Sequence, residues 1–584
     1  MSRSAIKTEV SPSRSAIYLA ILTGLVAALC YAQTLNSEFV SDDHFLILEN
    51  PIVQNNDLAK IFLSRFWITS ASSLYYRPLV TLSYWIDLHL WGVNPKGFHL
   101  TNIILHVLNS IMVFLAFKQW SGDLKTGFFT GLLFAVLPAH TQSVSWVSGR
   151  TDLICTLFGL TAFWIYLRAR DAGGPLGWKT ISASALCFLI AALAKETAAV
   201  FPVLVLAAEI IRPGARKFKP DKGGIVYYCV LAAVLLFYFL IRRAVLGFAL
   251  GYAAQPENKW YWEGLTDVSR PVMVLKIFYY YIITLAYPLN LCFECKLYPS
   301  LSWSDYRIFL SGAAVFGLVA AAVYSFRRMP AACLGILWFF IALLPVSNIL
   351  PIHEIAMEAY LYLPSIGFCL LLAGSALGLS DRFSRTGNIT AKKVATATLI
   401  IILIFLGLMT VKRNTVWKNS FLLWKDTVQK APHKNRAQFG LGVELYTKGD
   451  KQRAVLCFRR AFIADPSDFK AGFNLANTYL ELNKIDEAIR CYRELIRIYP
   501  GYIRARSSLG YALKQKGDLE GAVTAFQEAL NHAPDFQPAM INLAEIYIKL
   551  GRCDQAREMG IKLGPYLPSR ILKELNEKCP KEKL

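Results

Sequence analysis

The residues best suited to chemistry in this chain are charged and imidazole side chains at the edges of long apolar runs. Two adjacent carboxylates, Asp42 and Asp43, lie just past the first run. The other candidates are Arg77, His99, His106, His140, Arg150, Lys195 and Glu196. An ionisable group at the hydrocarbon edge of a membrane is unfavourable unless it is paired or functional. This combination predicts a site where cations bind a phosphate and a carboxylate takes a proton from a hydroxyl.

Structural roles remain open for the acidic pair and for the cations. Asp42 and Asp43 could cap a helix in the loop that follows them. Arg77 directly precedes a proline and could mark a turn beside the membrane. Lys195 and Glu196 are neighbours and could pair with each other. For each of these residues, the spacing along the chain is compatible with both interpretations.

The histidines also have structural alternatives. His99 and His106 lie seven residues apart, on one face of a predicted helix, and could join helices through ring hydrogen bonds. His140 follows Pro138 and could satisfy backbone carbonyls that a kink leaves free. We keep all three as candidates for contact with a phosphate or a sugar.

Apolar segments that could cross a membrane position these residues. The chain has 584 residues, of which 55% are hydrophobic and 17% charged. About twenty apolar residues are needed to cross a hydrocarbon core. Eleven spans are predicted, at 17–35, 98–118, 126–147, 152–168, 178–194, 197–211, 224–243, 306–326, 332–350, 359–379 and 394–411. Segment 272–289 is also apolar, and we interpret it as interfacial or re-entrant.

Basic loops orient the spans and explain the charge. Positive loops favour the cytoplasmic side, which places the N-terminus in the cytoplasm and the C-terminal region on the other side. The formal net charge of +22 then reflects loops that face anionic lipid, so no nucleic-acid partner is predicted.

Five prolines in the C-terminal region recur every 34 residues, at 432, 466, 500, 534 and 568. This interval is the period of the tetratricopeptide repeat, a helical pair that stacks into a solenoid. An all-α fold is therefore predicted for the whole chain. Side-chain amides can pair with an extended polypeptide, so the candidate acceptor-binding residues are Asn474, Asn477, Arg506 and Asn542. Each of these could equally be an ordinary solvated position.

These patterns divide the chain into four parts. We expect a membrane domain at 1–413, a coupling segment at 414–434, four repeats at 435–568 and a tail at 569–584.

Several motifs resemble the transmembrane and tetratricopeptide repeat-containing O-mannosyltransferase-like family. The longest is L-F-A-V-L-P-A-H-T-Q-S-V-S-W-V-S-G-R-T-D at 133–152. The others are D-D-H at 42–44, Y-R-P-L at 76–79, F-H-L-T-N-I-I-L-H at 98–106, A-K-E-T at 194–197, Y-L-Y-L-P-S-I-G-F-C at 360–369 and V-W-K-N-S-F-L-L-W at 416–424. The resemblance covers nearly the whole chain, and the long stretch at 133–152 is its most specific part.

The resemblance implies a GT-C-like transmembrane bundle and an inverting glycosyltransferase of the GT-C class. Such an enzyme takes a sugar from a polyprenyl phosphate and attaches it to an acceptor on the non-cytoplasmic side. By correspondence of motifs, Asp42 and Asp43 would supply the base. Arg and Lys can neutralise the leaving phosphate, so no metal is required, although the acidic pair could bind Mg²⁺ or Mn²⁺ through its oxygens.

The sequence leaves three functions open. The first is transfer of mannose or another hexose to Ser or Thr of proteins, with the repeats binding the acceptor. The second is transfer to an envelope glycan or lipid, and the third is a non-catalytic scaffold. The segment E-I-A-M-E-A-Y at 354–360 lacks an Arg that members of this family commonly carry there, which argues for the scaffold, whereas the retained Asp42 and Asp43 argue against it. The first function, transfer to proteins, is therefore the prediction. Short loops favour a bacterial inner membrane with periplasmic repeats; an endoplasmic reticulum location would have luminal repeats.

Overall fold

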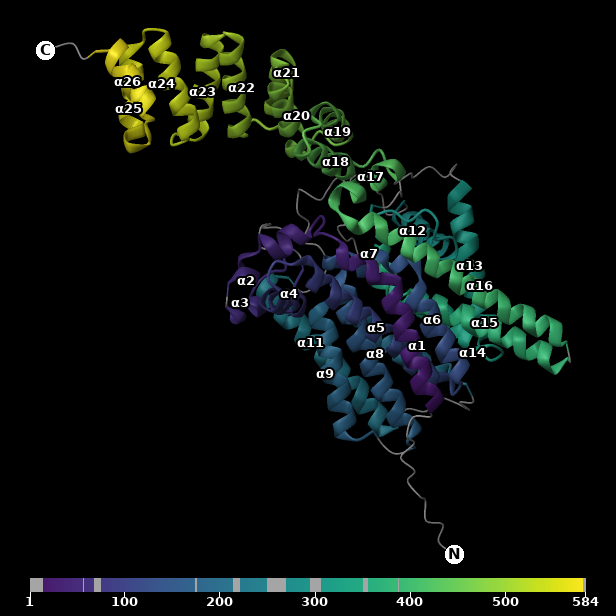
Figure 1. Ribbon diagram of the computed structural model, residues 1–584. Helices are drawn as coiled ribbons and strands as arrows, with labels where there is room; N and C mark the ends of the chain where they lie inside the picture. Colours follow the sequence, from purple (N-terminus) through teal and green to yellow (C-terminus); the bar gives the residue numbers. More distant parts are fainter. Residues whose placement is uncertain are drawn as a thin grey trace, which may run out of the picture. The chain divides into compact units, whose positions relative to one another are not determined.

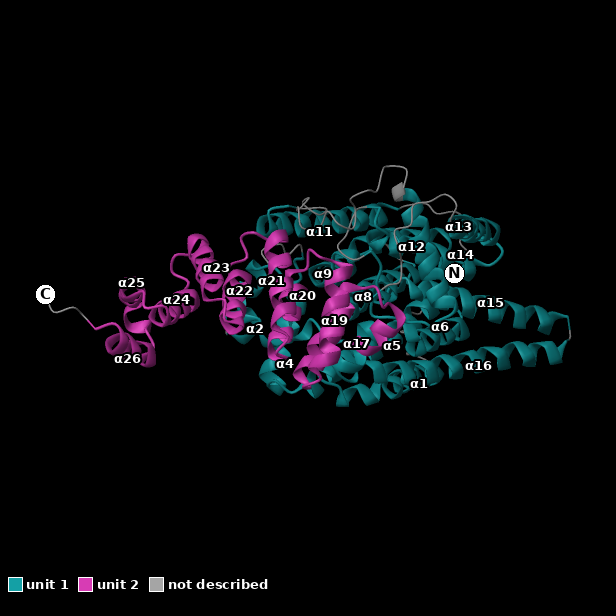
Figure 2. Cartoon of the chain, turned by 90° about the horizontal axis from the view of Figure 1, so that it is seen from above, with its two compact units in different colours: residues 1–423 teal, residues 424–584 magenta. Residues whose placement is uncertain are grey.

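The structure, a computed structural model, describes residues 14–580 except for 56, 68–74, 174–175, 214–220, 249–268, 295–305, 350–354 and 387. The described residues form helices and connecting turns, and they contain no strand. They divide into two compact units, residues 1–423 and 424–584 (Figures 1 and 2). The prediction of an all-α membrane protein that ends in helical repeats is confirmed.

Seven helical segments of the first unit are long and apolar enough to cross a membrane. The helices in these segments are α1 (Arg14–Tyr31), α5 (Pro95–Ser121), α8 (Arg150–Asp171), α11 (Lys222–Leu246), α13 (Tyr306–Ser325), α15 (Ser365–Arg385) and α16 (Ile389–Asn414). They correspond to seven of the eleven predicted spans. The other four are shorter helices, α6 (Leu124–Val136), α9 (Trp178–Ala194), α10 (Phe201–Ile210) and α14 (Pro330–Leu343). Segment 272–289 forms most of α12 (Ser269–Ala286).

The predicted span at 126–147 is interrupted. Helix α6 ends at Val136, and Leu137 is extended (φ −72°, ψ 121°). The following Pro138 explains this break, because its ring disfavours helical backbone in the residue before it. Residues 138–149 then form only short turns around α7 (Thr141–Ser145), and all of them are buried. Irregular backbone at membrane depth is tolerated where protein covers it, as here.

Helix α5 is packed against α1, α6 and α8, while α8 also packs against α9 (Figure 1). Small residues allow the closest approaches. A Cβ atom on Gly127 of α6 would lie 2.6 Å from the Lys118 nitrogen of α5, and one on Gly335 of α14 would lie 2.5 Å from the Gly367 oxygen of α15. Membrane helices commonly use small residues to bring their backbones together in this way.

Short helices of the first unit connect these long ones. Between α1 and α5 lie α2 (Pro51–Gln54), α3 (Leu58–Leu63) and α4 (Pro78–Trp91). A turn at residues 40–43 precedes them, and a 3₁₀ turn, Glu196–Val200, joins α9 to α10. The candidate charged residues lie mostly at these connections.

The second unit begins with most of α17 (Ser420–Lys430) and continues as helix pairs. The pairs are α18 (Asn435–Thr447) with α19 (Lys451–Ala464), α20 (Phe469–Glu481) with α21 (Ile485–Ile498), α22 (Ile503–Lys516) with α23 (Leu519–His532), and α24 (Gln537–Lys549) with α25 (Cys553–Leu563). The turns inside the pairs have positive φ at Gly449, Asn483, Gly517 and Gly551. These positions recur every 34 residues, as the prolines do, because each pair reverses direction through the same left-handed residue.

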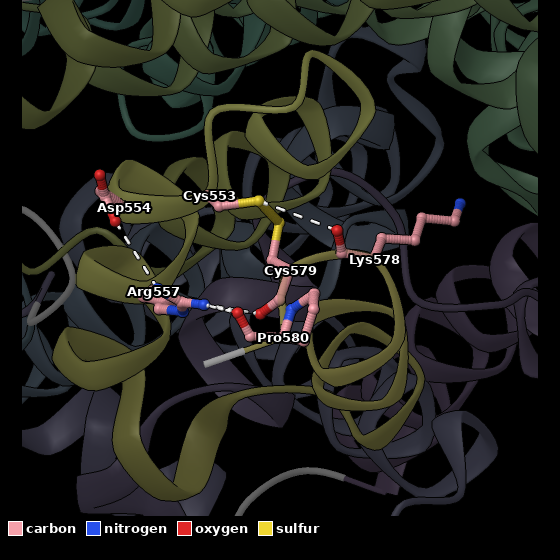
Figure 3. Close-up of a disulfide and its surroundings, with 6 residues drawn as sticks. All are labelled: Cys553, Asp554, Arg557, Lys578, Cys579 and Pro580. Atoms are coloured by element: carbon pink, nitrogen blue, oxygen red, sulfur yellow. Dashed lines mark hydrogen bonds and ion pairs between the residues drawn. A yellow bond between two sulfur atoms is a disulfide. The ribbon is translucent and has the colours of Figure 1, made fainter. Parts of the chain in front are cut away.

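A final helix, α26 (Ser569–Lys578), covers the last repeat. Its Ile571 and Leu575 are buried. A disulfide joins Cys553, at the start of α25, to Cys579, directly after α26, with a Cα–Cα distance of 5.3 Å (Figure 3). Arg557 donates a hydrogen bond to the Cys579 carbonyl, at 2.9 Å.

Candidate active site

The acidic pair lies in a turn between α1 and α2. The Asp43 nitrogen donates to the Val40 carbonyl at 3.2 Å, which closes the turn. The Val40 nitrogen donates back to Asp43 Oδ2 at 3.0 Å. Between them, Ser41 has a left-handed backbone with φ of 53°. The two carboxylates differ in their surroundings: Asp42 is half-buried, whereas Asp43 is fully buried.

Asp43 is held by the interrupted segment that precedes α8. The Ser148 nitrogen donates to Asp43 Oδ1 at 2.8 Å, and the Ser148 hydroxyl donates to the same oxygen. Trp146 Nε1 donates to the Val40 carbonyl at 3.3 Å. Burial raises the pKa of Asp43 to about 7, against the opposing effect of the hydrogen bonds from Ser148 and Val40.

A second group of charges lies where α4, α8, α9 and α10 begin or end. Arg77, which precedes α4, contacts Glu196 through two hydrogen bonds, Nη2 to Oε1 at 2.7 Å and Nε to Oε2 at 3.2 Å. The Arg77 guanidinium also lies over the Tyr75 ring, at 4.3 Å from its centre. Burial raises the pKa of Glu196, but the charge and hydrogen bonds of Arg77 outweigh it and lower this pKa to about 2.

Lys195 pairs with Asp152, not with its neighbour Glu196. The Lys195 Nζ to Asp152 Oδ1 distance is 2.6 Å, and Nζ lies 5.2 Å from the centre of the Tyr360 ring. Arg242, near the end of α11, is a third cation that lowers the pKa of Glu196 electrostatically. These three cations and two carboxylates form a mixed charge cluster, which we call the Arg77–Lys195 cluster. Its net charge of +1 suits an anionic ligand.

Arg150 has a different environment. Its guanidinium is fully buried and pairs with Asp87 at 2.6 Å. It also donates to Asn102 Oδ1 at 2.7 Å, to the Phe98 carbonyl at 2.9 Å and to the Ser83 carbonyl at 3.2 Å. These bonds engage Nε and both Nη atoms. In this arrangement Arg150 joins α8 to α4 and α5, and its charge is neutralised within the protein.

The candidate histidines lie in the interior of the first unit. His106 Nδ1 is 2.8 Å from the Tyr362 hydroxyl, and its Nε2 donates to the Ala135 carbonyl at 3.2 Å. His140 Nε2 lies 2.7 Å from the Ser365 hydroxyl. The two imidazoles are 5.7 Å apart, centre to centre. His99 is also fully buried, on the first turns of α5. The structure does not bring His106 and His140 into contact with the cluster around Arg77.

The four candidate acceptor-binding residues lie on α20, α22 and α24, the first helices of their pairs. Each contacts another residue of the second unit. The contacts are Asn474 to the Lys470 carbonyl, Asn477 to the Tyr492 hydroxyl, Arg506 to Glu528, and Asn542 to Lys514 and the Pro538 carbonyl. A bound polypeptide would have to share or replace these hydrogen bonds.

Ser148, Asp152 and Asp87 were not among the residues that the sequence singled out. Ser148 and Asp152 belong to the long motif at 133–152, so the motif itself was the available signal. Asp87 had no such signal, because it is a single carboxylate on a short, mostly apolar helix. Among the described residues, no group of three or more His, Cys, Asp or Glu side chains could hold a metal ion.

Similar proteins share both regions of the chain. A human protein named Protein O-mannosyl-transferase TMTC3 is 25% identical over 93% of this chain and 63% of its own length. A Caenorhabditis elegans Protein O-mannosyl-transferase is 29% identical over 75% of this chain and 61% of its own length. The resemblance inferred from the motifs is confirmed.

Family models described as tetratricopeptide repeat match residues 439–503, 473–538 and 513–568. A solved structure titled "Crystal structure of MamA" is 16% identical, covers 34% of this chain and 96% of its own, and has a TM-score of 0.24. The chain spans about three fifths of the length of the curated relatives named above. Its apolar helices and these relatives establish an integral membrane protein with C-terminal repeats.

Proposed function

We propose that this protein is a membrane glycosyltransferase of the GT-C class that modifies proteins. It would transfer mannose or another hexose from a polyprenyl phosphate to Ser or Thr hydroxyls on the non-cytoplasmic side. The observation that carries the proposal is the conjunction of an acidic turn, with Asp42 half-buried at its tip, and a cation-rich cluster built on Arg77 and Lys195. Relatives named protein O-mannosyl-transferases support the transfer of mannose to proteins.

The chemistry is a single displacement with inversion. The acidic pair takes the proton of the acceptor hydroxyl, whose oxygen forms a bond to the anomeric carbon of the sugar. The bond from that carbon to the phosphate oxygen breaks, and the lipid phosphate leaves with the electron pair. Arg77 and Lys195 would stabilise the charge that develops on it. Because these cations supply the neutralisation, the proposed mechanism requires no metal.

The repeats would bind the acceptor polypeptide, through polar residues of α20, α22 and α24. The disulfide between Cys553 and Cys579, at the end of the repeats, supports a non-cytoplasmic location for them. Disulfides persist in oxidising compartments and are rare in the cytosol. A periplasmic location on a bacterial inner membrane fits this argument, and so does the lumen of the endoplasmic reticulum.

The proposal is tested by the mass of glycans on envelope or luminal proteins from cells with the wild-type gene, a deletion, or Asp42→Asn/Asp43→Asn. We expect hexose-sized adducts that disappear in the deletion and in the double variant. Asp57→Asn is the matched control, because Asp57 is a neighbouring surface carboxylate that pairs with Lys60, and asparagine retains the capability to cap the first turn of α3. Adducts that persist in the deletion would refute protein glycosylation by this chain. Adducts that are lost in the deletion but persist in the double variant would place the catalytic base on another residue.

A further inference from the structure

The turn that carries the acidic pair is tied to the rest of the first unit through Asp43. Both carboxylate oxygens of Asp43 accept hydrogen bonds: Oδ1 from the nitrogen and the hydroxyl of Ser148, and Oδ2 from the Val40 nitrogen. Trp146 contacts the Val40 carbonyl from the same segment as Ser148. Residues 40 and 43 are thus joined to each other and to residues 146–148.

The segment that holds this turn is itself fixed. Ser145 donates to Asn414 Oδ1 at 2.8 Å, and Asn414 Nδ2 donates to the Cys30 carbonyl at 2.8 Å. A Cβ atom on Gly149 would lie 2.6 Å from the Ser143 oxygen, so the backbone beside Ser148 is closely packed. Through these contacts α1 and α16 provide a rigid support for Ser148.

The support stabilises an unfavourable backbone conformation. Ser41 has φ of 53°, a value that residues other than glycine and asparagine seldom adopt. Such a conformation persists when surrounding contacts determine it, and these conformations concentrate at functional sites. Here the contacts of Asp43 on either side of Ser41 close the turn, and they leave Ser41 and Asp42 at its tip.

The positions of the two carboxylates suggest different roles. A general base must come within hydrogen-bond distance of the proton it accepts. Asp43 has no exposed surface, and its oxygens already accept three hydrogen bonds from the protein. Asp42 is half-buried at the tip of the turn, and the Ser41 hydroxyl donates to its Oδ1 at 3.2 Å.

We infer that Asp42 is the catalytic carboxylate, and that Asp43 and Ser148 are positioning residues that hold the turn in the conformation that presents it. This inference rests on the proposed glycosyl transfer. It assigns the two halves of the acidic pair to separate tasks, and it adds Ser148, from a distant part of the chain, to the residues that determine the rate.

The test measures sugar transfer by the full-length protein in detergent, with a polyprenyl-phosphate mannose donor and a Ser- and Thr-containing peptide. Asp42→Asn is expected to reduce kcat by at least a thousandfold. Ser148→Ala is expected to reduce kcat about tenfold, from the loss of one buried hydrogen bond to Asp43, with the donor KM within twofold of wild type. Ser148→Thr retains the hydroxyl and is expected to stay near the wild-type rate.

A second-site variant separates positioning from general destabilisation. Glycine adopts positive φ without steric strain but lacks the Ser41 hydroxyl that donates to Asp42, so Ser41→Gly alone is the reference. In that background Ser148→Ala should lower kcat by clearly less than it does in the wild-type background. A kcat of Ser148→Ala equal to that of wild type, or a loss that is equally large in both backgrounds, would overturn the inference. So would an Asp42→Asn variant that keeps more than a tenth of the wild-type kcat.

Amide hydrogen exchange measures how stably the turn at residues 40–43 is formed, independently of enzyme activity. The Val40 and Asp43 amides should be protected in wild type and in Ser148→Thr, and should exchange about tenfold faster in Ser148→Ala. A wild-type protein that shows this pattern but transfers no mannose would refute mannosyl transfer by this protein and leave the anchored turn established. An active wild type whose exchange is unchanged by Ser148→Ala would refute the anchoring role of Ser148.

Discussion

The guanidinium of Arg77 donates two hydrogen bonds to the carboxylate of Glu196, which lies 119 residues further along the chain. The paired side chains are 12% and 27% exposed, so the pair is mostly buried but keeps an edge open to solvent. Arg77 can therefore bind an anion at the edge of the pair while Glu196 keeps the guanidinium oriented.

Replacing Arg77 by lysine keeps the charge but removes the planar fork. A lysine ammonium cannot reproduce the two parallel bonds to Glu196, so we expect Arg77→Lys to raise the donor KM about tenfold and to lower the stability by about 2 kcal/mol. Transfer kinetics and thermal unfolding in detergent measure the two effects. Arg497→Lys is the control, because the Arg497 side chain is 73% exposed and also pairs bidentately, with Glu494. Equal effects of Arg77→Lys and Arg497→Lys would contradict the role of Arg77 in binding the donor.

The buried pair of Arg150 and Asp87 should contribute to stability and not to donor binding. The two side chains are 0% and 4% exposed. Removing one partner leaves a buried charge, so Asp87→Leu and Arg150→Met should each destabilise the protein by about 3 kcal/mol. The double variant should be less destabilised than the sum of the single ones, which a double-mutant cycle of unfolding measurements tests. A donor KM that rises selectively in Arg150→Met would instead place Arg150 at the phosphate.

Burial of Asp43 should make stability depend on pH. Its pKa is raised from the ordinary value of 3.8 to about 7, so the folded state retains a proton that the unfolded state releases. The resulting stabilisation is complete below about pH 4 and is lost as the pH rises to about 7. The melting temperature of wild type minus that of Asp43→Asn should therefore fall as the pH rises over this range and stay constant above it. A value of this difference that rises with pH would show that the folded protein favours the ionised carboxylate.

The disulfide between Cys553 and Cys579 should stabilise the end of the repeats. It closes a loop with a sequence separation of 26, for which the chain-entropy model gives about 3.5 kcal/mol. We expect Cys553→Ser/Cys579→Ser to expose α26 to hydrogen exchange and to leave α18–α21 unaffected, because each repeat contacts mainly its neighbours. Cys229→Ser, at an exposed free cysteine, is the control. Unchanged exchange in α26 would indicate that packing of Ile571 and Leu575 alone holds this helix.

Sequence patterns predicted the fold where the pattern is local. Each repeat buries one face of two neighbouring helices, so the 34-residue period of Pro432 to Pro568 reflects the same contacts four times over. The apolar runs were equally informative, since a membrane requires a minimum apolar length. The break after Val136 was visible only in part, because Pro138 signals a kink without showing that irregular backbone continues to residue 149.

By itself the sequence determined the membrane region, the repeats, the family resemblance and the set of candidate charges. Only the tertiary structure decided which charges meet. Lys195 and Glu196 are neighbours, yet one pairs with Asp152 on α8 and the other with Arg77 before α4. Likewise the fully buried Asp43 is held by Ser148. Spacing along the chain cannot reveal such contacts, because an ion pair depends on how helices far apart in sequence pack and which way each side chain points.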